Sequence, residues 1–478
     1  MNALLTNESS FLYEKIVEDI STNISSGILK PGEKLPSIRK LSNKLHVSMS
    51  TIMQAYIELE DLGLIEAKPQ SGYYVRFSPN RTLPEIEIRN IESAIKNYGC
   101  DGLVTNLCEL SSIPNIISLG AAAPSNENLP IKKLASIIKS LCRSDNYGIE
   151  YEFAPGNSKL RREIAKKSFE WGYNSTIDDI VISSGGNDAL NLSLRAVAKP
   201  GDNIAIECPT YYGLIQIIEE LGMNAIRIST QPRHGMDIEA LKKAVKNQKI
   251  AACVLYPCIS NPLGSIMSED SKKEIYLFLS SKNIPIIEGD IYGELYFGKT
   301  RPTPIKAIDN KGIVLYHSSF SKTIAPGFRI GWVMPGRYFE RVKRLKYLSS
   351  VSAPVLPQLA IAEFLRSGGY ERCLRKLRQV YSIRQKMLSS YVSKYFPETT
   401  KLSTPQGGLH LWVELPKEVD SIKLQRLALK ENISVAPGPL FSTKDCFINC
   451  IRLSYATTWN SSIEIGIKKI GEIAKSML

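Results

Sequence analysis

Lys322 is the residue of this sequence best suited to covalent chemistry. It follows an apolar segment at 313–317 and lies between Ser321 and Arg329, with Ser319 shortly before it. A cationic neighbour such as Arg329 favours the uncharged amine, which is the form that a Schiff-base lysine requires. Lysines are usually solvated, however, so the position of Lys322 does not establish this role by itself.

Two further apolar segments end in residues that could bind an anion and a flat ring. Ser184-Gly185-Gly186-Asn187 follows the segment at 180–183 and precedes a helical pattern. Glycines let backbone N–H groups approach an anion at a helix N-terminus, although an ordinary strand-to-helix turn has the same composition. Tyr211 follows the segment at 203–207, where its ring could stack on a ligand or pack in the core.

Two more apolar segments are followed by an amide, a carboxylate and a phenol. Asn261 comes after the segment at 250–256, and its amide could donate to a ligand oxygen or form an Asx turn. Asp290 and Tyr292 follow the segment at 284–289. A carboxylate directly behind so apolar a segment needs a partner. A protonated ring nitrogen would suit Asp290, and a helix N-cap is the alternative.

These apolar segments alternate with helical patterns such as the one at 188–198. The alternation predicts an α/β domain with a mostly parallel sheet covered by helices on both faces. In such sheets ligands bind beyond the carboxyl ends of the strands, which is where all of these polar residues are expected.

The order of these groups resembles the PLP-dependent aminotransferases of fold type I, from about residue 115 to residue 478. The block SFSKTIAPGFRIGW carries the most specific part of the resemblance. It implies that pyridoxal 5′-phosphate (PLP) is bound covalently by Lys322, that Asp290 pairs with the pyridinium nitrogen, and that Tyr211 stacks on the ring. Tyr292 and Asn261 would hydrogen-bond the ring hydroxyl. The implied phosphate ligands are Gly186, Asn187, Ser319, Ser321 and Arg329.

The resemblance extends to two residues outside these segments. Tyr151 begins the pattern Tyr-x₄-Gly-x₃-Leu-Arg, whose tyrosine in the family reaches the phosphate of the neighbouring subunit; this implies a homodimer. Arg452 takes the place of the arginine that binds the α-carboxylate of the substrate. One departure is Gly186-Asn187, where relatives often carry hydroxyl and glutamine side chains. Backbone N–H groups could still bind phosphate there.

Residues 9–75 contain three amphipathic helical patterns followed by a hairpin pattern. The first helix is predicted at 9–28, and Ser37 and Ser48 can cap the second and third. Residues 64–75 predict two short strands around a glycine-containing turn. Three helices and a small hairpin make a winged helix.

This segment resembles the GntR-type winged helix through the framework LPSxRxLxxxLxVSxxT. A GntR head before an aminotransferase body is the arrangement of the MocR/GabR subfamily of bacterial regulators. The resemblance implies double-stranded DNA as a partner, with the third helix in the major groove and the wing near the minor groove. The implied DNA contacts are Arg39, Ser48, Ser50, Thr51, Gln54, Ser71 and Gly72.

The charge of the head gives a mixed indication. The whole chain has a net charge of +13, but residues 1–80 carry eight Lys/Arg and nine Asp/Glu. Between Lys34 and Ile57, four basic residues and no acidic ones form a local basic patch.

Relatives usually carry arginine where this chain has Met49, and often a basic residue further along, near Met53. Since arginine is the commonest reader of guanine, this departure predicts weaker binding or readout of thymine methyl groups. A winged helix used only for protein contacts is the alternative.

The composition is that of a globular protein of several domains. The chain has 478 residues, 43% of them hydrophobic, and no apolar run reaches the roughly 18 residues of a membrane span. The N-terminus has no signal-peptide pattern. Nine scattered cysteines without a Cys-x-x-Cys pair predict a reducing cytoplasm, and four dispersed histidines give no metal-ligand pattern.

The predicted organisation has three parts: a winged helix at 1–78, a linker at 79–112 and an aminotransferase-like domain at 113–478. The linker is predicted to be partly helical at 91–97, and the last domain to divide at about residue 355.

Two functions fit these patterns. The first is a transcriptional regulator that senses a small amino compound through its PLP-binding domain. The second is an active aminotransferase with a vestigial head, which Met49 and Met53 favour slightly. The two do not exclude each other, and the framework of the winged helix favours the first.

Overall fold

A computed structural model describes residues 12–25, 28–61, 64–68, 71–76, 83–86, 113, 115–143, 148–232, 234–442 and 446–478. The chain divides into two compact units, residues 1–82 with 386–394 and residues 83–385 with 395–478. Most of the predicted linker, with the helical stretch predicted at 91–97, lies outside the described residues.

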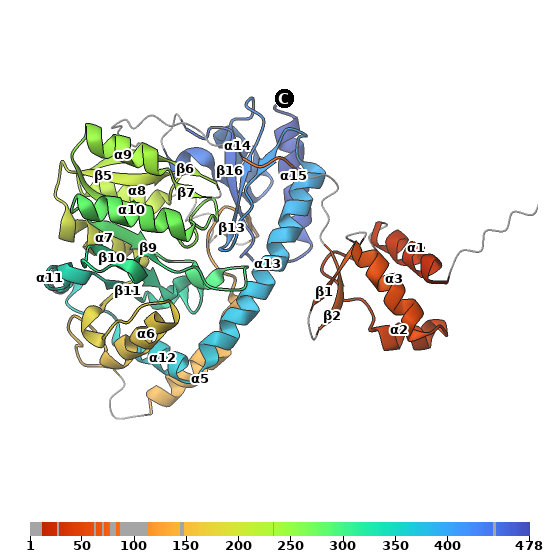
Figure 1. Cartoon of the computed structure of the whole chain (residues 1–478), viewed down its shortest axis with the longest axis horizontal. Helices are drawn as coiled ribbons and strands as arrows, with labels where there is room; N and C mark the ends of the chain where they lie inside the picture. Colours follow the sequence, from red (N-terminus) through yellow and green to blue (C-terminus); the bar gives the residue numbers. More distant parts are fainter. Residues whose placement is uncertain are drawn as a thin grey trace, which may run out of the picture. The chain divides into compact units, whose positions relative to one another are not determined.

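The N-terminal unit contains the predicted three helices and hairpin (Figure 1). Its elements are α1 (Leu12–Ser25), α2 (Ile38–Leu45), α3 (Met49–Asp61), β1 (Ile65–Lys68) and β2 (Gly72–Val75). Both predicted caps are confirmed: Ser37 Oγ accepts from the Lys40 backbone N–H at 3.3 Å, and Ser48 Oγ accepts from that of Thr51 at 3.1 Å. Each cap satisfies a backbone donor that the first turn of a helix leaves without a partner.

A small apolar core holds the head together. Ile52, Tyr56 and Leu59 of α3 are fully buried, against Ile16 and Ile20 of α1. The Tyr56 hydroxyl donates to the Pro36 carbonyl at 2.8 Å, and burial raises the pKa of Tyr56 to about 12. The third helix is therefore fixed both by packing and by a hydrogen bond to the segment before α2.

Within the described residues, the second unit is built on an eight-stranded sheet of order β4-β11-β10-β9-β8-β5-β6-β7. Its strands are β4 (Val181–Ser183), β5 (Asn203–Cys208), β6 (Asn224–Gln231), β7 (Gly235–Met236), β8 (Ile250–Leu255), β9 (Ile286–Gly289), β10 (Val314–Ser319) and β11 (Gly331–Met334). The five strands from β10 to β6 run parallel. Strand β11 pairs antiparallel with both β10 and β4, and β7 pairs antiparallel with β6. The mostly parallel sheet is confirmed, and β6, β7 and β11 add to the five strands predicted.

Helices cover both faces of this sheet, as predicted (Figure 1). They are α5 (Ile131–Leu141), α6 (Ser158–Glu170), α7 (Gly186–Val197), α8 (Tyr212–Glu220), α9 (Ile238–Asn247), α10 (Glu269–Ser281), α11 (Phe339–Ser350) and α12 (Val355–Arg366). Alternate strand residues point to opposite faces. Ile287 and Leu315 pack with α7, α8 and α11, whereas Ile286 and Val314 pack with α9 and α10. This alternation decides which polar residues can meet at the strand ends.

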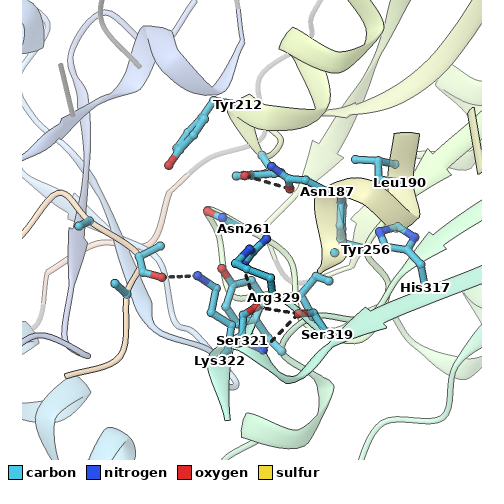
Figure 2. Close-up of a pocket in the computed structure, with 17 residues that line it drawn as sticks. Asn187, Leu190, Tyr212, Tyr256, Asn261, His317, Ser319, Ser321, Lys322 and Arg329 are labelled. Atoms are coloured by element: carbon cyan, nitrogen blue, oxygen red, sulfur yellow. Dashed lines mark hydrogen bonds between the residues drawn. The ribbon is translucent and has the colours of Figure 1, made fainter. Parts of the chain in front are cut away.

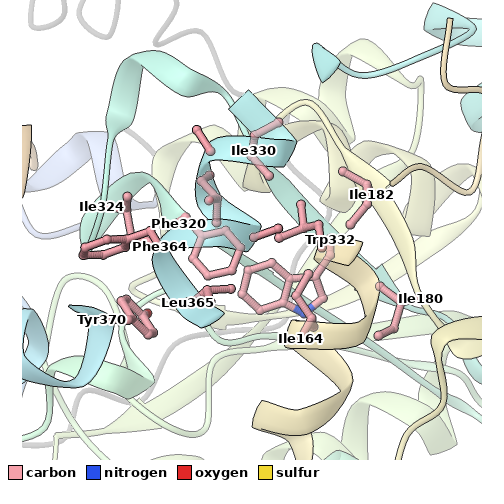
Figure 3. Close-up of a cluster of buried hydrophobic side chains, with 14 of the residues drawn as sticks. Ile164, Ile180, Ile182, Phe320, Ile324, Ile330, Trp332, Phe364, Leu365 and Tyr370 are labelled. Atoms are coloured by element: carbon pink, nitrogen blue, oxygen red, sulfur yellow. The ribbon is translucent and has the colours of Figure 1, made fainter. Parts of the chain in front are cut away.

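A third buried cluster joins α5, α6 and α12 to the β4–β11–β10 side of the sheet (Figure 3). Trp332 of β11 lies at its centre, with its ring 4.6 Å from that of Phe320 and stacked 6.1 Å from that of Trp171. Phe320 immediately precedes the pair Ser321-Lys322. The cluster therefore anchors the turn on which the candidate lysine lies.

The C-terminal part of the unit adds a smaller antiparallel sheet of order β12-β13-β16-β15. The elements of this part are α13 (Gly369–Tyr395, of which residues 386–394 are grouped with the first unit), β12 (Lys401–Leu402), β13 (His410–Glu414), α14 (Ser421–Lys430), β15 (Ala436–Pro437), β16 (Cys450–Ser454) and α15 (Ser462–Lys475). A separate parallel pair joins β14 (Ile433–Ser434) to β3 (Ile117–Ser118), so β3 packs with the C-terminal part. None of the described helices is long and apolar enough to cross a lipid bilayer.

Glu207 on β5 makes the stability of this unit dependent on pH. Its Oε2 accepts from the Tyr256 backbone N–H at 2.9 Å, and burial raises the pKa of Glu207 to about 7. A raised pKa means that the folded state binds this proton more tightly than the unfolded chain. The contribution to stability is therefore complete below pH 4.5 and is lost as the pH rises through about 7.

We expect Glu207→Gln to remove this part of the pH dependence, because glutamine imitates the protonated acid. The effect should reach up to about 3 kcal/mol for a shift of this size in a buried group. Thermal unfolding at a series of pH values from about 4 to about 8 would measure it. Parallel curves for wild type and variant would contradict the assignment.

Candidate functional site

A cavity of about 310 Å³ lies at the carboxyl ends of the parallel strands (Figure 2). Most of the residues that were predicted from sequence to form one site line it. They are Gly186, Asn187, Tyr211, Asn261, Tyr292, Ser319, Ser321, Lys322 and Arg329. The cavity wall does not include Asp290, Tyr151 or Arg452.

One end of the cavity has the geometry of an anion site. Gly185 caps α7 with a φ of 90°, and any side chain there would overlap the Arg329 guanidinium. Arg329 Nη1 donates to Ser321 Oγ at 3.2 Å, and Ser319 Oγ donates to Ser321 Oγ at 2.9 Å. A guanidinium, two hydroxyl groups and a helix N-terminus together suit a phosphate. The absence of a side chain at Gly185 is what allows the Arg329 guanidinium to lie beside the start of α7.

Lys322 and Tyr211 line the same cavity. Lys322 ends a short 3₁₀ turn after β10, and its Nζ donates to the Ala122 carbonyl oxygen at 2.5 Å. The Tyr211 hydroxyl donates to Asn187 Oδ1 at 3.3 Å, which links the residue after β5 to the N-terminus of α7. The amine and the aromatic ring are therefore placed beside the anion site, although they come from different strand ends.

Arg452 is a buried cation that reaches the cavity through Asn261. Its Nη1 donates to Asn261 Oδ1 at 3.0 Å and its Nη2 to the Gly120 carbonyl oxygen at 2.6 Å. The guanidinium lies 4.8 Å from the centre of the Phe441 ring. Arg452 is fully buried, its Nε has no hydrogen-bond partner among the described residues, and no carboxylate of those residues forms an ion pair with it. Buried charges normally have a charged partner, so this arginine is suited to bind a ligand carboxylate.

Tyr292 and His410 form a second polar contact at the cavity. Tyr292 Oη and His410 Nε2 lie 3.2 Å apart, and both side chains are buried. Burial raises the pKa of Tyr292 and lowers that of His410 far below its ordinary value. Both groups are therefore uncharged near neutral pH, and Tyr292, which lines the cavity, can exchange a hydrogen bond with a ligand without adding a charge.

The structure differs from the sequence prediction at Asp290. The carboxylate forms an ion pair with Arg301, accepts from the Tyr316 hydroxyl at 2.9 Å and accepts from the Gly293 backbone N–H at 2.9 Å. Its side chain has no exposed surface and is not among the residues that line the cavity. The reason is strand parity: Asp290 shares a face with Tyr316, whereas α7 and the cavity lie on the face of Gly289 and His317.

Tyr151 lies outside the cavity on an exposed apolar surface. The side chain is 76% exposed and stacks on Phe153 with ring centres 5.8 Å apart. Phe153 lies in turn beside Tyr347, whose ring centre is 6.3 Å away. Ile149 and Leu348, which are close to these aromatic residues in the sequence, are also exposed. We call these five residues, Ile149, Tyr151, Phe153, Tyr347 and Leu348, the aromatic patch.

Sequence reasoning missed several residues of the cavity wall. Tyr256 lines it from directly after β8 and His317 from β10. Leu190 of α7 and the small residues Ala121–Ala123, in the loop after β3, complete this set. His317 gave one signal: a histidine inside an apolar strand, directly before the lysine block, is unusual for a core position. Ala121–Ala123 gave none, because only the pairing of β3 with β14 brings that loop to the site.

In the head, the residues predicted to contact DNA lie at the surface. Arg39, Ser48, Ser50, Gln54 and Gly72 are exposed, and Thr51 and Ser71 are half-buried. Ser48 Oγ lies 2.7 Å from both Ser50 Oγ and Thr51 Oγ1, so three hydroxyl groups gather at the start of α3.

The same helix also exposes an apolar row. Met49, Met53 and Ile57 are 58%, 43% and 39% exposed and follow one another at four-residue spacing. Residues four apart lie on one side of a helix. The described face of α3 can therefore offer both hydroxyl groups and apolar side chains to a groove.

Comparisons with known proteins agree with both units. Residues 114–470 match the family described as "Aminotransferase class I and II", and residues 12–75 match "Bacterial regulatory proteins, gntR family". The "Uncharacterized HTH-type transcriptional regulator YjiR" of Escherichia coli (strain K12) is 36% identical, covering 96% of this chain and 98% of the relative. The "Uncharacterized HTH-type transcriptional regulator YdcR" of the same organism is 34% identical, covering 98% and 99%.

A solved structure supports the fold of the second unit. The kynurenine aminotransferase of Pyrococcus horikoshii, in complex with PMP, superposes with a TM-score of 0.73 at 29% identity, covering 79% of this chain and 95% of that one. The chain belongs to the aminotransferase class I and II family. With its GntR-type head, it is a member of the MocR/GabR subfamily of GntR-type transcriptional regulators.

Proposed function

We propose that this regulator binds PLP in its aminotransferase-like domain, senses a small amino compound there, and binds double-stranded DNA through its head. The observation that supports this most is the cavity, because it combines a lysine, an anion site and a nearby buried arginine that has no carboxylate partner among the described residues. The same chain contains a winged helix, whose DNA binding a ligand in this cavity would regulate.

The residues of the cavity fit PLP at three of its functional groups. Gly186, Asn187, Ser319, Ser321 and Arg329 would hold the phosphate. Lys322 would hold the aldehyde carbon, and Asn261 and Tyr292 would face the ring hydroxyl. When bound, PLP supplies an electrophilic carbon that captures primary amines reversibly. Arg452 would then orient an amino compound by its carboxylate, as a bidentate guanidinium does.

We further propose that the active form is a homodimer that uses the aromatic patch. Three of the five patch residues are more than 60% exposed, which is unusual for such large apolar side chains. In a dimer, Tyr151 would reach the phosphate of the neighbouring subunit. Sedimentation of the PLP-loaded protein at micromolar concentration tests this, and a monomer there would contradict it.

Regulation requires that the ligand bind two arrangements of the heads with different affinity. The predicted linker over 79–112 is the segment that must transmit or permit this difference. A ligand that binds both arrangements equally would have no regulatory effect.

The experiment that tests the function is capture of genomic fragments by the purified, PLP-loaded protein, followed by sequencing. We expect a few discrete sites, each containing a repeat beside a gene. No enrichment, with or without a panel of amino compounds, would favour an aminotransferase with a vestigial head. Met49 and Met53, which stand where relatives carry DNA-reading side chains, are the observation that keeps this second function open.

We expect Arg39→Ala to weaken DNA binding on every sequence by a similar factor. Arg39 is exposed at the second helix, so it can contact backbone phosphate. Losing one phosphate contact should also lower the slope of log affinity against log salt by about 1. Affinities on specific and random duplexes at several salt concentrations measure both effects.

Lys15→Ala is the matched control, because Lys15 is exposed on α1, outside the helix-turn-helix. Equal losses in the two variants would indicate general electrostatics, and no loss in Arg39→Ala at moderate salt would contradict the docking.

A further inference from the structure

His317 is a buried polar side chain that the proposed function leaves without a role. It lies on β10 two residues before Ser319, is fully buried and lines the cavity (Figure 2). Among the described residues, neither Nδ1 nor Nε2 has a hydrogen-bond partner. Buried polar atoms are nearly always satisfied. A ring with both nitrogens unpaired at a cavity wall therefore indicates a ligand atom.

Of the residues that the structure describes, no acid lines the wall around His317. Asp290 points to the other face of the sheet and is neutralised by Arg301. Gly289 faces the cavity side, but a side chain at this position would overlap the ring of Tyr256. Among the described residues that line the cavity, the charged ones are the cations Lys322 and Arg329. The described part of this wall therefore offers no carboxylate partner for a ring nitrogen.

The covalent structure of PLP places its ring nitrogen near this wall. The nitrogen is para to the ring carbon that carries the aldehyde, the group that the lysine binds, and the two neighbouring ring carbons carry the phosphate arm and the hydroxyl group. With Lys322, the anion site and Asn261 assigned to those three groups, the nitrogen must face away from Lys322. Figure 2 shows His317, Tyr256 and Leu190 together on that side. The Tyr256 and His317 rings lie 6.3 Å apart, edge to face.

We propose that His317 donates a hydrogen bond to the ring nitrogen of PLP and keeps that nitrogen unprotonated. This rests on the proposed binding of PLP. An unprotonated ring withdraws electrons more weakly than a pyridinium. The cofactor would therefore capture an amine but would promote further bond breaking poorly, which suits a sensor better than a catalyst.

The electrostatics around His317 support a neutral imidazole. Burial lowers the pKa of His317 to about 4, against a smaller opposing effect of Asp290. Burial also raises the pKa of Tyr256, the other titratable group on this wall. A neutral imidazole carries one N–H to donate. A pyridinium here would place a positive charge in an apolar wall without a counter-charge, which burial strongly disfavours.

The test is ¹⁵N NMR of the full-length protein loaded with PLP that is ¹⁵N-labelled in the ring. Free labelled PLP, protonated and unprotonated, provides the two reference positions. We expect the bound resonance at the unprotonated position near neutral pH, and at the protonated position in His317→Asp. A wild-type resonance at the pyridinium position would overturn the proposal.

Two further variants test the identity of the partner. His317→Phe should keep the nitrogen unprotonated but shift the resonance toward that of a pyridine without a hydrogen bond. Tyr256→Phe, the matched control on the same wall, should leave it in place. A shift of the resonance in Tyr256→Phe but not in His317→Phe would assign the hydrogen bond to Tyr256 and overturn the role of His317.

Borohydride reduction of the same samples separates this proposal from the one on which it rests. No adduct at Lys322 in the wild type would overturn both. An adduct together with a protonated ring nitrogen would leave PLP binding intact and overturn only the role of His317.

Discussion

Lys322→Ala should remove all covalent PLP capture. Lys322 is the amine on the cavity wall, beside the anion site formed by Ser319, Ser321 and Arg329. Alanine cannot form an imine, so PLP would remain only through phosphate and ring contacts. We expect no borohydride-reducible adduct by mass spectrometry, and loss of the cofactor on gel filtration.

Lys199→Ala is the matched control, because Lys199 is an exposed lysine of the same unit. It should keep a full adduct. If Lys322→Ala still yielded a reducible adduct, peptide mapping would identify the amine that had reacted, and the assignment of the site would be wrong.

Arg452→Ala should strongly weaken binding of an amino acid ligand to the PLP-loaded protein. The guanidinium is fully buried and is held by Asn261 and the Gly120 carbonyl, without an acidic partner among the described residues. A ligand carboxylate paired with it would be desolvated, and truncating one partner of such a pair costs about 3 kcal/mol, or roughly a hundredfold in Kd. Calorimetric or spectroscopic titration with an amino acid that perturbs the cofactor spectrum measures this.

The control for Arg452 uses the ligand as well as the protein. The corresponding amine without the carboxylate should bind wild type and Arg452→Ala almost equally, because it makes no ion pair. Arg452→Lys should recover only part of the affinity, since lysine keeps the charge but loses the bidentate fork. If the amine and the amino acid lost the same factor, Arg452 would act by supporting the cavity loop at Gly120.

The local elements were predictable because they depend on short-range physics. Ser37 and Ser48 could be identified as caps from residue type and the apolar pattern that follows, and both accept the expected backbone hydrogen bond. The apolar segments that became β5, β8, β9 and β10 stood out because a strand buried on both faces is continuously apolar. The antiparallel strand β11, which lies between β4 and β10, was not predicted, since GWVM lies inside a block whose resemblance drew attention to its chemistry.

The sequence predicted at which strand ends the site residues lie, but not the direction in which each side chain points. Parallel strands bring their carboxyl ends to one edge, which gathers Asn187, Tyr211, Asn261 and Lys322 whatever their distance along the chain. Which face a residue points to changes with each single step along a strand. Asp290 was therefore expected in the cavity and lies behind the sheet, paired with Arg301, while His317 was not expected and lines it.

The sequence by itself determined the order of the two domains and the family to which each belongs. It also identified the lysine and the arginine that the proposed chemistry needs. These follow from residue identity and spacing, which folding does not alter. Only the tertiary structure decided what each polar group faces. It joins β3 to β14 and so brings Gly120 to Arg452, and it places the Tyr256 ring over Gly289. Such partners lie far apart in the chain, and close packing alone fixes them.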